Sequence, residues 1–135
     1  YKLTMIGNDQ KYLKLNDYPR NPNIKLFGQV TKDSTLIGYY DKNDILILPS
    51  YIEAYPQVIL ESLSRLKPII IFNEIRHLKK TFKFGIFSCN RDEKSLESTI
   101  KKIMNNYTNI QKNILKEKIF TQKEFFLDIK KIFKS

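Results

Sequence analysis

The stretch Asp44–Phe72, DILILPSYIEAYPQVILESLSRLKPIIIF, holds two apolar runs, ILIL (Ile45–Leu48) and IIIF (Ile69–Phe72), on either side of a helix-like segment. Neither run alternates apolar with polar residues, as a strand with one face in water would. A strand without alternation is typically buried on both faces, as in a parallel sheet with helices on each side. The stretch therefore predicts a strand, a helix and a second strand of an α/β domain.

Further apolar runs extend this alternation along most of the chain. The strands expected besides these two are Leu3–Ile6, Ile24–Phe27 and Ile86–Cys89. The helices expected between strands are Asp9–Tyr18, Ser34–Tyr40, Gln57–Leu66 and Glu74–Phe82. The predicted fold class is therefore α/β, with a Rossmann-like, doubly wound parallel sheet.

Three helices are expected to close the chain. In Lys94–Tyr107, the residues Ile100, Ile103, Met104 and Tyr107 form one apolar stripe suited to packing on the sheet. The other two helices are expected near Asn109–Lys118 and at Gln122–Lys134.

The composition favours anionic partners, which include nucleotides, acidic lipids and nucleic acid. The 135 residues include 24 basic and 14 acidic side chains, for a net charge of +10. Twenty of the basic residues are Lys and four are Arg. Because Arg is the residue preferred for bidentate contacts to phosphates and bases, no nucleic acid is expected as a partner. No apolar run approaches the ~20 residues of a membrane-spanning helix, and the single Cys89 allows no internal disulfide and fits a reducing compartment.

Several familiar site motifs are missing. The four glycines, Gly7, Gly28, Gly38 and Gly85, form neither a G-x-G-x-x-G motif nor a P-loop. One His and one Cys cannot build a zinc site, and there is no D-x-D. We interpret the lone His77 as a surface residue without a function, and we expect neither a metal nor a cofactor.

Two acids, Glu53 and Glu61, bracket the start of the helix in the central stretch. The loop that carries Glu53 follows a strand at its carboxyl end, the edge at which open α/β sheets bind ligands. Pro56 suits the first turn of the helix, and the free N–H groups at Gln57 and Val58 would form an anion site. Carboxylates accept pairs of hydroxyl donors, as sugars offer. The arrangement indicates a nucleotide-sugar, and the alternative is two ordinary exposed acids.

The stretches NIKLFGQV (Asn23–Val30) and Asp44–Phe72 resemble the C-terminal, donor-binding domain of retaining GT-B glycosyltransferases of group 1, the family 4-like enzymes. The Pro-Ser-x-x-Glu opening, the Glu-x7-Glu pair and the downstream Lys-Pro carry the resemblance, which spans roughly residues 3–90. It implies transfer of a hexose from a UDP- or GDP-linked donor, with retention and without an obligatory metal. Related enzymes make capsule, lipopolysaccharide and other surface polysaccharides.

The resemblance also implies roles for individual residues. Glu53 would be the catalytic residue, holding hydroxyls of the donor sugar, and Glu61 would bind the ribose hydroxyls. Backbone contacts to the sugar and diphosphate would come from Tyr55, Pro56, Gln57 and Val58. The loops around the base would be Gly28, Gln29 and Val30 after one strand, and Gly7 and Asn8 after another.

The sequence departs from the family pattern at three positions. Arg65 and Leu66 stand where a small residue and a Gly are usual before the Lys-Pro, and Ala54 replaces a Gly. The resemblance further implies that residues 1–135 form a single nucleotide-sugar-binding domain. It implies that this domain lacks its first strand, and with that strand the Arg and Lys that clamp the diphosphate. The N-terminal acceptor domain would be missing as well. We therefore expect weak donor binding and no turnover by this chain alone.

The expected location is the cytoplasm, peripheral at the inner face of a membrane, with an acidic membrane surface as a second partner. Two alternatives remain open. One is a nucleotide-sugar epimerase on the same scaffold, and the other is a basic, non-enzymatic anion-binding module.

Overall fold

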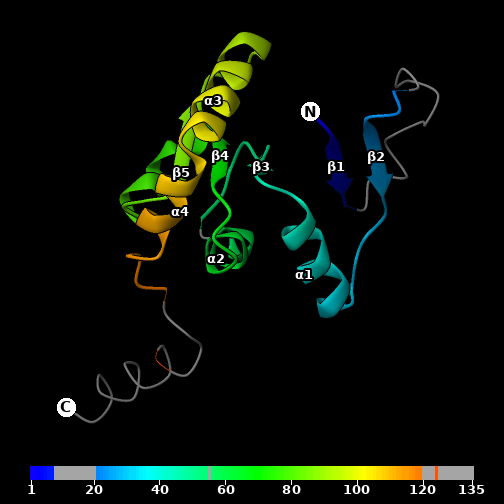
Figure 1. Ribbon diagram of the computed structural model, residues 1–135, viewed down its shortest axis with the longest axis horizontal. Coiled ribbons are helices and arrows are strands. Elements are labelled where there is room, and N and C mark those ends of the chain that lie inside the picture. The colour runs from blue at the N-terminus through cyan, green and yellow to red at the C-terminus, as the bar shows by residue number, and fades with distance from the viewer. Residues whose placement is uncertain (8–20, 55, 120–123, 125–135) are drawn as a thin grey trace. The chain divides into compact units, whose positions relative to one another are not determined.

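The computed structural model describes residues 1–7, 21–54, 56–119 and 124 (Figure 1). Contacts between residues divide the chain into two compact units, Tyr1–Asp44 and Ile45–Ser135, and each is described by itself. The predicted helix Asp9–Tyr18 lies outside the described residues, as does the predicted helix Gln122–Lys134 apart from Glu124. The predicted assignment of residues 1–135 to one domain remains a prediction.

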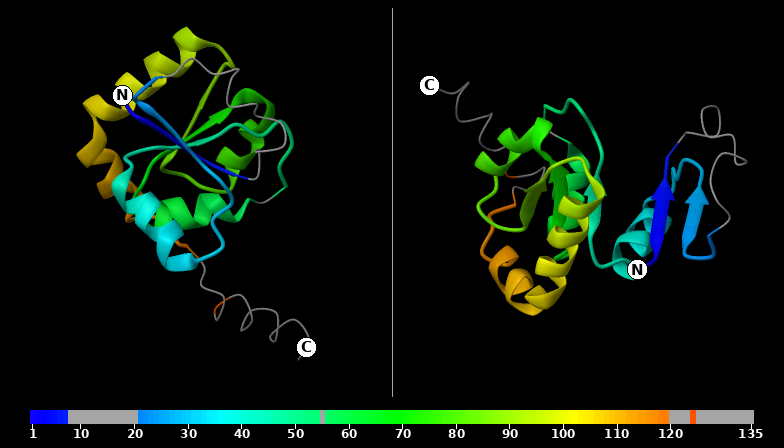
Figure 2. Two further views of the ribbon diagram at one scale, coloured as in Figure 1. Left: turned by 90° about the vertical axis from the view of Figure 1, so that its right-hand side faces the viewer. Right: turned by 90° about the horizontal axis from the view of Figure 1, so that it is seen from above.

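The first unit contains two parallel strands and a helix. Strand β1 (Leu3–Ile6) pairs with β2 (Ile24–Phe27) along their whole length, and the two arrows point the same way in Figure 2. Helix α1 (Asp33–Lys42) follows, and its Tyr39 ring lies 5.0 Å from the ring of Phe27 between centroids. Both predicted strands are confirmed, and the helix begins one residue earlier than expected.

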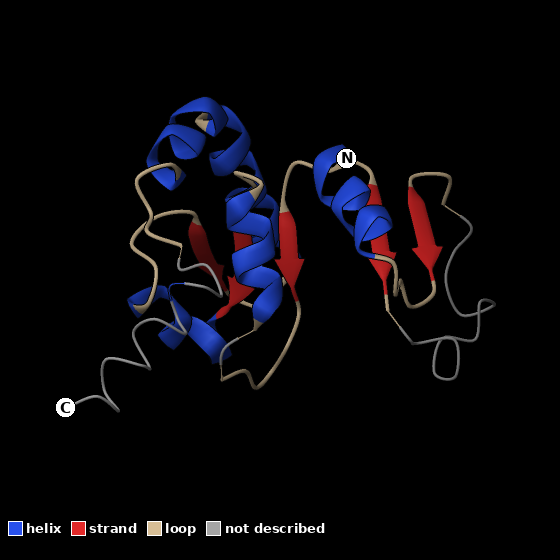
Figure 3. Ribbon diagram, turned by 90° about the horizontal axis from the view of Figure 1, so that it is seen from below, coloured by secondary structure: helices blue, strands red, loops and turns tan. Residues whose placement is uncertain are grey.

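The second unit contains a three-stranded parallel sheet in the order β3-β4-β5 (Figure 3). Its strands are β3 (Leu46–Leu48), β4 (Ile69–Phe72) and β5 (Ile86–Cys89). All four residues of β4 are buried, as the run IIIF predicted. The residues of β3 are only half-buried, so the prediction of burial on both faces is wrong for ILIL. β3 lies at an edge of this sheet and packs against the core without being fully covered, whereas β4 lies at the centre.

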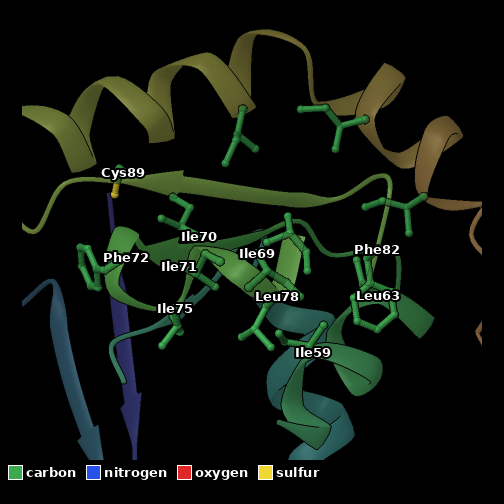
Figure 4. Close-up of a cluster of buried hydrophobic side chains, with 14 residues drawn as sticks. Ile59, Leu63, Ile69, Ile70, Ile71, Phe72, Ile75, Leu78, Phe82 and Cys89 are labelled. Carbon is green, nitrogen blue, oxygen red and sulfur yellow. The ribbon is translucent and has the colours of Figure 1, made fainter. Parts of the chain in front are cut away.

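Helices cover both faces of this sheet (Figure 4). Helix α2 (Gln57–Ser64) and the 3-10 helix η3 (Asn73–Lys80) supply buried side chains below the sheet in that view, whereas α3 (Glu93–Asn105) and α4 (Tyr107–Ile114) lie on the opposite side. The core between these layers includes Ile59, Leu63, Ile75, Leu78, Ile103 and Ile114, each at most 2% exposed. The predicted α/β fold with parallel strands and C-terminal helices is therefore confirmed.

The predicted helix Glu74–Phe82 is wrong in type. The segment is the 3-10 helix η3, interrupted at Ile75, whose φ of −112° and ψ of 22° are not helical. Ile75 and Leu78 are both buried. A 3-10 helix has three residues per turn, so two apolar residues three apart lie on one side, and this spacing occurs in an α-helix as well. The apolar pattern could not distinguish the two.

The predicted helix Lys94–Tyr107 is broken near its end. Asp92 caps α3 by accepting a hydrogen bond from the N–H of Ser95 over 2.8 Å. The helix ends at Asn105, and its C-cap residue Asn106 has a φ of −129°. Tyr107 begins α4, which ends at Ile114, short of the expected Lys118. The chain turns at Asn106, yet three of the four predicted stripe residues pack as expected: Ile103 is buried, and Ile100 and Tyr107 pack against the core, whereas Met104 is 41% exposed.

Candidate functional site

The loop between β3 and α2 carries Glu53, and we call residues 49–54 the Glu53 loop. Within it the Ser50 hydroxyl donates a hydrogen bond of 2.7 Å to Oε1 of Glu53. Glu53 is half-buried, whereas Ile52 before it is 90% exposed. The Glu53 carboxylate therefore has a defined partner at the carboxyl end of a strand, unlike a fully exposed acid.

A side chain from beyond β5 holds the start of this loop. Arg91 donates from Nη1 to the carbonyl oxygen of Pro49 over 3.0 Å and from Nη2 to that of Ser50 over 3.1 Å. Its Nε donates to Oε1 of Glu74 over 3.1 Å. The fork of guanidinium N–H groups suits this pattern, because adjacent carbonyls and a carboxylate are engaged at once.

The same guanidinium lies against two aromatic rings. Its central carbon is 3.8 Å from the ring centroid of Tyr51 and 4.1 Å from that of Phe72. These distances are within the range of cation–π contacts. Phe72 is the last residue of β4, so Arg91 joins the carboxyl end of the central strand to the Glu53 loop.

Glu74, the acid that pairs with Arg91, has a lowered pKa. A hydrogen bond from its own backbone N–H, followed by the hydrogen bond from Arg91, lowers the pKa of Glu74 below the usual value of 4.5. The carboxylate form that Arg91 needs is therefore favoured in the folded chain.

His77, expected to be a surface residue without a function, is exposed and forms a hydrogen bond to the Glu53 loop. Its Nε2 lies 2.9 Å from the backbone carbonyl oxygen of Glu53. Because a carbonyl oxygen only accepts, Nε2 carries the proton in this contact. The backbone of Glu53 is thus bonded to η3, while the two residues at the start of its loop are bonded to Arg91.

The start of α2 follows the Glu53 loop. Pro56, with φ −72° and ψ 123°, is the N-cap residue and not part of the first turn, so its predicted position was wrong by one residue. Proline fits there because the fixed φ also suits the extended conformation of a cap. Gln57, the first helical residue, is exposed, and Val58 is half-buried. No side chain caps this end of the helix.

Glu61 lies in the second turn of α2 and is half-buried. Ile59 and Leu63, two positions to either side of Glu61, are 1% and 0% exposed and form the buried side of α2, from which Glu61 points away. Its role at the ribose stays a prediction.

The residues expected near the base belong to the first unit. Gly28, Gln29 and Val30 follow β2 directly, with Gln29 exposed and the other two half-buried. Gly7 follows β1, and its N–H donates to the carbonyl oxygen of Phe27 over 3.3 Å. This bond brings the two predicted base loops to the same end of the strand pair. Asn8 and Tyr55 lie outside the described residues.

Sequence reasoning missed the residues that support Glu53. Ser50 is part of the Pro-Ser-x-x-Glu opening but was given no role, and Arg91, Glu74 and His77 were not assigned to the site. One signal was present: Arg91 is one of only four arginines and follows β5 by two residues, at the edge where Glu53 was expected. No comparable signal pointed to His77.

Two other features of the described residues bear on the site. No group of three or more His, Cys, Asp or Glu side chains among them is arranged to hold a metal ion. A surface pocket of about 320 Å³ lies where α3 meets α4, lined by residues 104–109 and Lys112, and contains none of the predicted donor-binding residues. Within the described part of the chain, no helix combines the length and apolar character that crossing a membrane requires.

Comparison with known proteins agrees with this arrangement of parallel strands and the loop–helix segment. No curated protein matches the chain. A family model described as glycosyl transferases group 1 matches residues 1–120, which include every strand of the described residues as well as Glu53 and Glu61. The chain therefore belongs to the group 1 glycosyl transferases.

Proposed function

We propose that this chain binds a nucleotide-sugar donor and holds its hexose for transfer with retention. Family membership over residues 1–120 supports the reaction class. The observation that carries the assignment of the sugar contact is Glu53, fixed by Ser50 and His77 directly before the start of α2.

The chemistry of a carboxylate suits the sugar. An ionised carboxylate accepts about four hydrogen bonds. Ser50 supplies one to Glu53, which leaves acceptor positions for vicinal hydroxyls of a hexose. A carboxylate fixed in this way would align the sugar, so that its anomeric carbon faces the acceptor, and would stabilise developing positive charge. In this proposal Glu53 acts by position and charge.

The diphosphate would lie at the start of α2. The first N–H groups of a helix lack intrahelical partners, and the helix dipole places partial positive charge there. The N–H groups of Gln57 and Val58 are at this end, next to Tyr55 and Pro56, and no side chain caps it. We assign these backbone groups to the diphosphate and sugar.

The remaining assignments follow the family pattern. Glu61 would accept hydrogen bonds from the ribose hydroxyls. The base would contact backbone groups of Gly28, Gln29 and Val30, and of Gly7 and Asn8.

The proposal extends to the whole enzyme. The chain would be the donor-binding part of a larger transferase, with an acceptor-binding domain as its partner and no obligatory metal. Synthesis of a surface polysaccharide at the inner face of a membrane, where the net charge of +10 would favour acidic lipids, is the proposed setting.

The donor site is tested by nuclear magnetic resonance titration of the chain with UDP-glucose and GDP-mannose. We expect one of them to shift the amide signals of Gly28–Val30 and Gln57–Glu61. Inorganic polyphosphate is the control for plain charge. Shifts confined to the lysines of α3 and α4, and equal with polyphosphate, would indicate a basic anion-binding module and contradict the proposal.

A further inference from the structure

We propose that Arg91 is a positioning residue for Glu53, acting through the backbone of the Glu53 loop rather than on the donor. The inference rests on the proposed function, because it concerns how Glu53 is presented to the donor sugar. It assigns a role to a residue that lies 38 positions after Glu53 in the sequence.

The first step is that the guanidinium is already engaged. Each of its three nitrogens donates a hydrogen bond: Nη1 to Pro49, Nη2 to Ser50 and Nε to Glu74. The Glu74 carboxylate beside it would also repel a phosphate. Arg91 is therefore unsuited to clamping the diphosphate, although it is a basic residue close to the proposed site.

The second step connects Arg91 to the Glu53 carboxylate through one residue. Ser50 accepts a hydrogen bond from Arg91 at its carbonyl oxygen and donates another from its hydroxyl to Glu53. Because Arg91 holds the Ser50 backbone in place, the position of the Ser50 hydroxyl is restricted. The Glu53 carboxylate oxygen that accepts its hydrogen bond is therefore restricted as well. Contacts of the guanidinium with the Tyr51 and Phe72 rings restrict its own movement.

The third step is that the contact needs a fork. Nη1 and Nη2 reach the carbonyls of consecutive residues, Pro49 and Ser50. A lysine ammonium is a point charge on a flexible stem and lacks the planar fork. Arg91→Lys therefore keeps the positive charge but loses the forked geometry. The variant distinguishes a role of the charge from a role of the two hydrogen bonds to the loop backbone.

The experiment measures the affinity of the chain for UDP and UDP-glucose, and for GDP and GDP-mannose, by amide titration. The variants are Arg91→Gln and Arg91→Lys. The control is Arg76→Gln, which removes the same charge from an exposed arginine of η3. Amide spectra and circular dichroism of each variant, without ligand, establish that the sheet is intact.

We expect both Arg91 variants to weaken binding of the nucleotide-sugar by roughly three- to tenfold relative to its nucleoside diphosphate. Affinity for the nucleoside diphosphate alone should change less than about twofold. The amide signals of residues 50–54 should show faster motion in the heteronuclear Overhauser effect. Arg76→Gln should match the wild type in every readout.

Three results would overturn the inference. If Arg91→Gln weakens UDP and UDP-glucose equally, or disrupts the sheet, then Arg91 acts on the phosphates or on the fold. If Arg91→Lys behaves as the wild type, the positive charge at position 91 is sufficient and the forked guanidinium is not required. If the wild type itself binds no nucleotide-sugar, the proposed function fails, and the positioning role fails with it.

Discussion

Nη1 of Arg91 lies 3.0 Å from the carbonyl oxygen of Pro49, across 42 residues of sequence. Arg91 follows β5 and Pro49 follows β3, two strands that are not neighbours, since β4 lies between them. The contact therefore spans the carboxyl end of the central strand. It makes the order of the Glu53 loop depend on the assembled sheet, and not on local sequence alone.

Gly85 has no room for a side chain. Its φ is +84°, and an added Cβ would lie 2.6 Å from Cδ2 of Leu63 and 2.8 Å from Cγ1 of Ile114. We expect Gly85→Ala to lower the free energy of unfolding by about 2–4 kcal/mol, from left-handed backbone strain and overpacking together. Urea denaturation followed by circular dichroism measures the change.

Gly38 provides the matched control in the other direction. It lies inside α1, and an added Cβ would meet nothing within 4 Å. Gly38→Ala should stabilise α1 by about 0.5–1 kcal/mol, because alanine loses less backbone entropy in a helix. Equal effects of the two substitutions would contradict the packing described around Gly85.

Leu66 occupies a position that usually holds glycine. Its φ is 57°, and its N–H bonds to the carbonyl oxygen of Leu63 while that of Lys67 bonds to Ser62, each over 2.9 Å. These are the two bonds of a Schellman motif that ends α2. The departure from the family pattern at this position is thus accommodated by a strained backbone and not by a different turn.

This strain predicts that glycine at position 66 gives a more stable protein than alanine, the reverse of their usual order in a helix. Leu66→Gly and Leu66→Ala both lose the leucine packing, and both keep residue 66 in the left-handed region, where alanine is strained and glycine is not. We expect the glycine variant to be more stable by about 0.5–1 kcal/mol, after its greater unfolded-state entropy is included. Thermal unfolding of the pair decides the matter, and a more stable alanine variant would argue against the turn.

The ionisation of Glu74 reports on its contact with Arg91. Its pKa is below 4.5 because of its own backbone N–H and then Arg91. A depressed folded pKa means that the contribution to stability is present above pH 4.5 and is lost as the pH falls through the folded pKa. Carboxyl carbon titration should show the pKa of Glu74 rising towards 4.5 in Arg91→Gln. An unchanged titration would mean that the Arg91 contact does not form in solution.

The sequence predicted the parallel strands well, because burial of whole runs is a direct consequence of their position. The four consecutive apolar residues of β4 are all buried. The shorter β3 shows the limit of this reasoning, since a run of the same kind, Ile45–Leu48, is only half-buried. How much of the protein packs on a strand is a property of the folded sheet and not of the run.

The support of Glu53 could not be predicted in the same way. Ser50 is three residues from Glu53, so that contact was within reach of local reasoning. Arg91 bonds to Ser50 across 41 residues of sequence, and His77 bonds to Glu53 across 24. Such contacts depend on where strands end in space and on the unexpected 3-10 geometry of η3, neither of which a single sequence specifies.

The central claim is that the two acids hold different parts of one donor. It is tested most directly by the affinities of Glu53→Gln and Glu61→Gln for UDP and UDP-glucose, or for the GDP pair, with the exposed Glu93→Gln as control. Glu61→Gln should weaken the nucleoside diphosphate itself by roughly tenfold, since ribose contacts are lost.

Glu53→Gln should leave affinity for the nucleoside diphosphate unchanged and weaken only the nucleotide-sugar. Binding indistinguishable from the wild type in both variants, or the same loss in both for the diphosphate alone, would contradict the account.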